Sequence, residues 1–184
     1  MVLCSETANH RKEGWEMRNL KILLIEDCQK EAKEIVARLN ERAEQKNDSK
    51  YTFHFEALEG TIEDGENGHK YYESGVMKQI EKFLNDDHEE QIGLLLDVLL
   101  TKEDIENTLS SYYPQADLAK KIYFKFCDRI PIYMITGTAT FATRSDVIMG
   151  IDLSNQFIAK NALLRYKLES EIDKLFLYYK QYFE

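Results

Sequence analysis

The chain contains few of the residues that interrupt regular structure. Only eight glycines and two prolines occur among its 184 residues, well below the usual share in globular proteins. This scarcity excludes a collagen-like or low-complexity chain and leaves no compositional linker that could separate two domains. The composition therefore favours one domain of dense secondary structure, and a chain of this length can bury a substantial core without disulfides or metals.

Cysteines and long apolar runs are also scarce. The three cysteines, Cys4, Cys28 and Cys127, are odd in number and lack CxxC spacing, which favours neither a disulfide framework nor a zinc site. No stretch approaches the roughly 18 apolar residues that a membrane span needs, and the N-terminus has no apolar signal-peptide core. We therefore expect a cytoplasmic protein without a membrane partner.

Basic residues are outnumbered by acidic ones. The chain has 24 Lys and Arg against 33 Asp and Glu, a formal net charge of −9. This excess of negative charge disfavours nucleic acid as a partner. No glycine-rich phosphate-binding loop occurs, and the four histidines lack the spacing of metal ligands; they are His10, His54, His69 and His88.

Continuous apolar runs alternate along the chain with segments whose apolar residues have helical spacing. Residues 1–18 are polar and aperiodic, which predicts an N-terminal tail before a domain at 19–184. Apolar runs predict five strands, at 20–27, 51–58, 92–100, 131–137 and 156–160. Apolar residues at helical spacing lie between these runs, and a final helix is striped by Leu164, Leu168, Ile172, Leu175 and Tyr179. Five strand-helix units predict an α/β fold, with a doubly wound five-stranded parallel sheet in three α/β/α layers.

Polar side chains mark the carboxyl ends of four predicted strands. They are Glu26 and Asp27, Asp97, Thr136 and Lys160. Ligands bind beyond this end of such sheets, so we expect these side chains to converge. Three crowded carboxylates need a cation, and Mg²⁺ is a hard ion that suits oxygen ligands. With Mg²⁺ and one lysine the formal charges sum to zero, which predicts a site able to accept a phosphoryl group.

This ordered set resembles the receiver domain of two-component response regulators over residues 20–184. The matching segments are IED (25–27), LLLDVLL (94–100), MITGTA (134–139) and FIAK (157–160). The resemblance implies a flavodoxin-like receiver fold with Asp97 as the phosphoacceptor. It also implies that Glu26, Asp27, Asp97 and the backbone carbonyl of Leu99 hold Mg²⁺. Thr136 and Lys160 would contact the phosphoryl group, and the small Gly137 would leave the approach to it open. Thr136 and Phe157 would be the switch residues.

The chain departs from the family in its spacing. The separations 97 − 27 = 70 and 136 − 97 = 39 exceed the usual lengths, which adds segments around 59–91 and 101–115. The second of these segments could cover the site. The resemblance therefore implies a divergent member, with no DNA-binding output domain expected within this chain.

The function expected from this resemblance is that of a stand-alone receiver. Asp97 would accept a phosphoryl group from a histidine kinase or phosphotransfer protein, and the altered surface would engage a downstream protein; homodimerisation stays open. The chain would perform only its own phosphorylation and dephosphorylation and would not be an enzyme on other substrates. One alternative is a pseudo-receiver that binds partners without phosphorylation. A phosphatase of the haloacid-dehalogenase type is a further alternative, disfavoured because DVLLT (97–101) has Leu99 where such enzymes have a second acid.

Each candidate residue also has a simpler interpretation. Glu26 and Asp27 can cap a helix, Thr136 is an ordinary strand residue, and an aromatic such as Phe157 more often packs in a core. Asp97 is different, because a carboxylate flanked by LLL and VLL is costly to bury without a partner. The prediction therefore depends most on Asp97 and on the order of the whole set.

Overall fold

The computed structural model describes most of the predicted domain. It describes residues 17–46, 48, 50–58, 68–86, 91–100, 116–137, 141–166 and 168–184. Most of the predicted N-terminal tail and the loop segments 59–67 and 101–115 lie outside the described residues. Within the described ranges, no helix combines the length and the apolar character that crossing a membrane requires.

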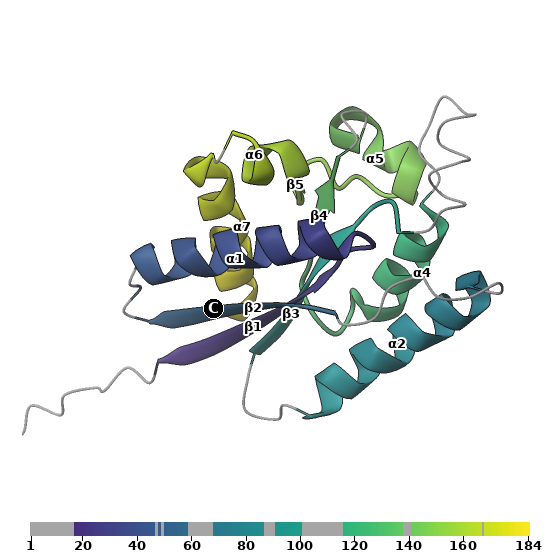
Figure 1. The fold of residues 1–184 in the computed structure, drawn as a ribbon, viewed down its shortest axis with the longest axis horizontal. Helices are drawn as coiled ribbons and strands as arrows, with labels where there is room; N and C mark the ends of the chain where they lie inside the picture. Colours follow the sequence, from purple (N-terminus) through teal and green to yellow (C-terminus); the bar gives the residue numbers. More distant parts are fainter. Residues whose placement is uncertain are drawn as a thin grey trace, which may run out of the picture.

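Five strands form one parallel sheet (Figure 1). They are β1 (Arg18–Ile25), β2 (Tyr51–Ala57), β3 (Gln91–Asp97), β4 (Ile132–Thr136) and β5 (Phe157–Ala159). Their order in the sheet is β2-β1-β3-β4-β5, and every pairing between neighbours is parallel. This is the strand order of a flavodoxin-like fold, so the predicted fold class is confirmed.

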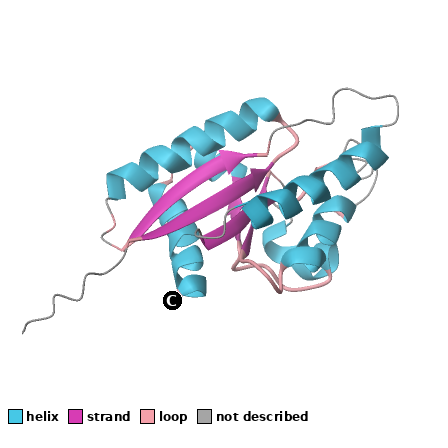
Figure 2. Cartoon of the chain, turned by 90° about the horizontal axis from the view of Figure 1, so that it is seen from below, coloured by secondary structure: helices cyan, strands magenta, loops and turns pink. Residues whose placement is uncertain are grey.

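Helices cover both faces of the sheet, as Figures 1 and 2 show. One face carries α1 (Gln29–Lys46), α6 (Lys160–Leu164) and α7 (Glu169–Phe183), whereas the other carries α2 (Gly68–Asp86), α4 (Asp117–Phe126) and α5 (Phe141–Met149). Each helix packs an apolar stripe on the sheet, which gives two separate core clusters. Side chains of β1 alternate between them, since Ile22 and Leu24 face α1 while Leu23 and Ile25 face the other core.

A glycine in the central strand lets α7 approach the sheet closely. A Cβ atom at Gly93 would lie 2.6 Å from the ring of Tyr179, so a larger residue would displace this helix. The hydroxyl of Tyr179 donates a hydrogen bond to the carbonyl oxygen of Leu94 at 2.5 Å. This contact joins α7 to the central strand of the sheet.

The third strand is shorter than predicted. The apolar run predicted a strand at 92–100, but β3 ends at Asp97. The backbone N–H of Val98 still donates to the carbonyl oxygen of Ile135, and Val98 and Leu100 are fully buried after the strand has ended. Residues 98–100 are apolar because they pack in or against the core. An apolar run does not distinguish such packing from a strand, so the sequence predicted a strand that was too long.

The predicted final helix is two helices. Residues from Leu164 to Tyr179 were expected on one stripe, but α6 ends at Leu164 and α7 begins at Glu169. The backbone N–H groups of Arg165 and Tyr166 both donate to the carbonyl oxygen of Asn161, which ends α6 in a tight turn. Leu168 therefore precedes α7 instead of lying within a continuous helix.

Candidate functional site

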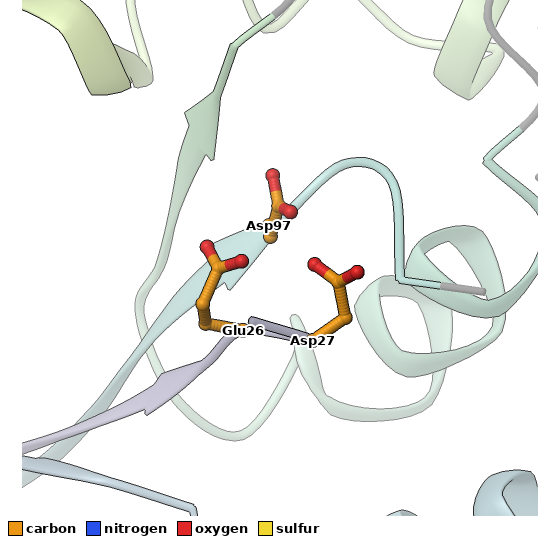
Figure 3. A group of neighbouring side chains, drawn as sticks. All are labelled: Glu26, Asp27 and Asp97. Carbon is orange, nitrogen blue, oxygen red and sulfur yellow. The ribbon is translucent and has the colours of Figure 1, made fainter. Parts of the chain in front are cut away.

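Three predicted carboxylates meet where β1 and β3 end. Glu26 and Asp27 directly follow β1, and Asp97 is the last residue of β3. These strands are neighbours in the sheet, with Ile25 paired to Leu96. One oxygen from each of the three carboxyl groups lies within 4.8 Å of the others. Figure 3 shows the three groups pointing into the same space, and we call Glu26, Asp27 and Asp97 the acidic cluster.

Lys160 reaches this cluster from the end of β5, the outermost strand on the β4 side of the sheet. It directly follows β5 as the first residue of α6. Its Nζ atom lies 2.9 Å from Oε1 and 2.7 Å from Oε2 of Glu26, and 3.0 Å from Oδ2 of Asp97. The structure thus brings the predicted lysine into contact with two of the three predicted acids.

A fourth carboxylate, Glu31, joins the site and was not predicted. It lies in the first turn of α1, and its Oε2 atom is 3.2 Å from Lys160 Nζ. It follows Asp27 by four positions, just inside the helix that begins at Gln29, and this closeness in sequence was the available signal. An acid in a first turn is common because it complements the helix dipole, so the sequence alone did not distinguish Glu31 from an ordinary helix start.

The two acids that contact Lys160 most closely are buried. Glu26 is 6% exposed and Asp97 is 2% exposed, whereas Asp27 is half-buried. Backbone N–H groups support both buried carboxylates: Cys28 donates to Glu26 Oε1 at 3.1 Å, and Val98 donates to Asp97 Oδ1 at 2.8 Å. These bonds hold the carboxyl groups in place and partly offset the cost of their burial.

Burial makes these carboxyl groups hard to ionise. It raises the pKa of Asp97 from 3.8 to about 7 despite the attraction of Lys160, and nearby Asp27 adds to the rise. Burial and the charge of Asp97 raise the pKa of Glu26 from 4.5 to about 8. Burial alone would lower the pKa of Lys160, but the adjacent Asp97 and Glu26 carboxylates raise it above its ordinary value. One ammonium is therefore too little positive charge for these acids.

The excess of negative charge and the closeness of the carboxyl groups mean that a metal ion could bind here. The acidic cluster and Glu31 against Lys160 give a formal charge of 1 − 4 = −3. The buried Oε2 atom of Glu26 accepts no hydrogen bond within the described part of the chain, although Lys160 Nζ lies 2.7 Å away. A buried acidic group with these properties could bind a metal ion.

The other predicted polar position also lies at this edge. Thr136 ends β4, is 2% exposed and pairs with Ala159, the residue before Lys160. Gly137 follows it and is exposed; an added Cβ there would lie 4.0 Å from Lys160 Cδ, and apart from its chain neighbours no other atom of the described residues would be closer.

Two apolar residues with predicted roles pack against the core. Leu99 is half-buried, and its side chain packs on the core beneath α2, α4 and α5. Phe157 is also half-buried and packs edge-on against Phe141, with ring centroids 5.7 Å apart. This packing agrees with the simpler interpretation of Phe157. The metal contact of the Leu99 carbonyl and the switch role of Phe157 stay predictions.

A surface hollow of about 1100 Å³ lies beside the site and does not cover it. Its lining comes from α1, α2, β1 and β2, and it includes Glu26 but not Asp27, Asp97 or Lys160. The candidate chemistry is therefore at the sheet's carboxyl edge, next to this hollow.

Comparisons with known proteins found no relative of this chain. No protein-family model matches the chain, and the searches of curated proteins and of solved structures found no match either. The function must therefore be inferred from the acidic cluster, Lys160 and their place in the fold.

Proposed function

We propose that the chain is a receiver-like phosphoacceptor in which Asp97 accepts a phosphoryl group in a Mg²⁺-dependent reaction. The observation that carries the proposal is the convergence of Glu26, Asp27, Asp97 and Lys160 at the carboxyl edge of a flavodoxin-like sheet. The donor would be a histidine kinase or a phosphotransfer protein. The phosphorylated surface would then engage a downstream protein.

The acidic cluster has the donor set that Mg²⁺ prefers. Its three carboxyl groups each offer an oxygen within 4.8 Å of the others, and carboxylate oxygens are among the ligands that Mg²⁺ takes in proteins. Mg²⁺ would reduce the formal charge of the site from −3 to −1. When bound, it would neutralise part of the charge on the transferring phosphoryl group.

The chain's own residues would divide the remaining tasks. An ionised Asp97 oxygen forms a bond to phosphorus while the bond between phosphorus and the donor histidine nitrogen breaks, and the imidazole keeps the electron pair and takes a proton. Lys160 lies 3.0 Å from Asp97 Oδ2, so its ammonium stabilises the charged nucleophile and is placed to donate to a phosphoryl oxygen. Thr136, at the neighbouring strand end, would donate to a second phosphoryl oxygen.

Intact-mass analysis after incubation with acetyl phosphate tests this proposal. We expect the wild-type protein to gain one phosphoryl group with Mg²⁺ and none without it. Asp97→Asn should gain none, because an amide is not a carboxylate nucleophile. Asp146→Asn is the matched control, since Asp146 is exposed on α5, and it should behave like the wild type.

Two outcomes would contradict the proposal in different ways. Labelling of Asp97→Asn to the wild-type extent would remove Asp97 as the acceptor. A wild type that stays unlabelled with saturating Mg²⁺ and donor would instead support an interaction module that functions without phosphoryl chemistry.

A further inference from the structure

The Lys160 ammonium lies within hydrogen-bond distance of three different carboxylates. Its Nζ atom is 2.7 Å from Oε2 and 2.9 Å from Oε1 of Glu26, 3.0 Å from Asp97 Oδ2 and 3.2 Å from Glu31 Oε2. An ammonium has three donors and no more. Lys160 must therefore give up one carboxylate before it can donate to a phosphoryl oxygen on Asp97.

The three partners are not equally easy to release. The side chains of Glu26 and Asp97 are 0% and 3% exposed, so either would be left buried and without its cation. Glu31 is 40% exposed and is the most distant of the three, so water can solvate it after release. Glu31 also lies outside the acidic cluster that would hold a metal ion. Its contact with Lys160 is the one that can be lost at least cost.

We propose that Glu31 restrains Lys160 in the unphosphorylated protein and is the partner that Lys160 releases when Asp97 is phosphorylated. This inference rests on the proposed function and adds a regulatory residue to the same site. Glu31 acts through Lys160 and is a positioning residue, because it competes with the incoming phosphoryl oxygen for one N–H donor. It therefore slows phosphorylation of Asp97.

Glu31→Gln tests the restraint, because it removes the charge and keeps the size of the side chain. At saturating Mg²⁺ and subsaturating acetyl phosphate, we expect it to be labelled about 1.4- to five-fold faster than the wild type, the range typical of a partly exposed charge pair. Glu34→Gln is the matched control. Glu34 is exposed on the same helix, so its loss makes the same change in net charge and should leave the rate unchanged.

A double variant tests whether Glu31 acts through Lys160. With Lys160→Met, the further change Glu31→Gln should have no effect on the labelling rate, because the restrained group is gone. If the Lys160 variant does not fold, the comparison of Glu31→Gln with Glu34→Gln still decides the inference.

The outcomes separate this inference from the proposed function. Wild type and Glu31→Gln labelled at the same rate, or Glu34→Gln accelerated as much as Glu31→Gln, would overturn the restraint and leave Asp97 as the acceptor. A wild type and variants that all stay unlabelled would overturn both.

Discussion

Two charged clusters of this protein differ in balance and burial. The first is the acidic cluster with Lys160 and Glu31 at the strand ends. The second joins α1 to α7: Arg42 lies 3.0 Å from Asp173 and 2.8 Å from Glu169, and Lys46 lies 2.9 Å from Asp173. We call Arg42, Lys46, Glu169 and Asp173 the α1–α7 network.

The two clusters shift carboxyl pKa values in opposite directions. In the α1–α7 network two cations balance two carboxylates, and although burial alone would raise the pKa of Asp173, hydrogen bonds from Arg42 and Lys46 lower it. At the strand ends one ammonium faces four carboxylates, and the pKa of Asp97 rises to about 7. A balanced, accessible network stabilises the fold, whereas an unbalanced buried cluster is the kind of arrangement found at functional sites.

Removing the central cation of the acidic cluster should have the largest effect on stability. We expect Lys160→Ala to lower the free energy of unfolding by about 3–5 kcal/mol at neutral or higher pH, because the buried carboxylates Glu26 and Asp97 lose the ammonium that contacts them both. The loss should be smaller near pH 5, where those groups can be protonated. Urea unfolding at both pH values measures it.

Lys46→Ala is the control from the other network. Lys46 is 35% exposed and Arg42 still contacts Asp173 after its removal, so we expect a loss below about 1 kcal/mol. Equal losses for Lys160→Ala and Lys46→Ala would contradict the distinction between the two clusters.

The pH dependence of stability should come next in size. The folded protein keeps protons on Asp97 and Glu26 up to about pH 7 and 8, whereas the unfolded chain releases them near 3.8 and 4.5. The folded state therefore binds more protons between these values, and the free energy of unfolding falls as the pH rises through this window. Without divalent ions we therefore expect the free energy of unfolding to be lower at pH 8.5 than at pH 5.

Asp97→Asn should flatten this pH profile, since it removes one titrating group and weakens the repulsion on Glu26. Urea unfolding of both proteins across the pH range tests this. A wild type as stable at pH 8.5 as at pH 5, without divalent ions, would contradict the raised pKa values.

Mg²⁺ should restore stability at high pH through Asp27. At a concentration ten times its dissociation constant, a ligand adds about 1.4 kcal/mol to the free energy of unfolding. We expect this gain in the wild type and its loss in Asp27→Ala, because the ion needs all three carboxylates of the acidic cluster. Calorimetric titration provides the affinity, and Asp146→Asn is again the control. An unchanged affinity in Asp27→Ala would place the ion elsewhere.

The smallest effect is expected in the α1–α7 network. Asp173→Asn should lower the free energy of unfolding by about 0.2–1 kcal/mol at pH 7, and added salt should reduce the loss. The sign of its pH dependence is opposite to that of Asp97: the lowered pKa of Asp173 means that its contribution disappears as the pH falls and the group is protonated. A loss that grows toward acid pH would contradict this assignment.

The sequence predicted the fold well because its central strands, β1 and β3, are buried on both faces. Runs such as residues 22–25 and 92–96 are apolar without alternation, which is typical of parallel strands between two helix layers. The same burial caused the error at Val98 and Leu100, which are apolar core residues beyond the end of β3. Burial is encoded in residue type, but the end of a strand depends on backbone hydrogen bonds.

The site was predicted where topology alone determines position. Asp97 and Lys160 converge because parallel strands end at one edge of the sheet. Glu31 was missed because its contact with Lys160 depends on two things that strand order does not determine. These are the position at which α1 begins after β1 and the conformation of the long Lys160 side chain. The pairing of Arg42 with Asp173, 131 residues away, likewise depends on the side-by-side packing of two helices, which no sequence spacing reveals.

The most direct test of the central claim is to locate the phosphoryl group. The wild-type protein is incubated with acetyl phosphate and Mg²⁺, any acyl phosphate is trapped by borohydride reduction, and the peptides are sequenced by mass spectrometry. We expect one reduced residue, at Asp97, and none when Mg²⁺ is omitted. Reduction at another carboxylate, or at no residue although donor and Mg²⁺ are saturating, would contradict the central claim.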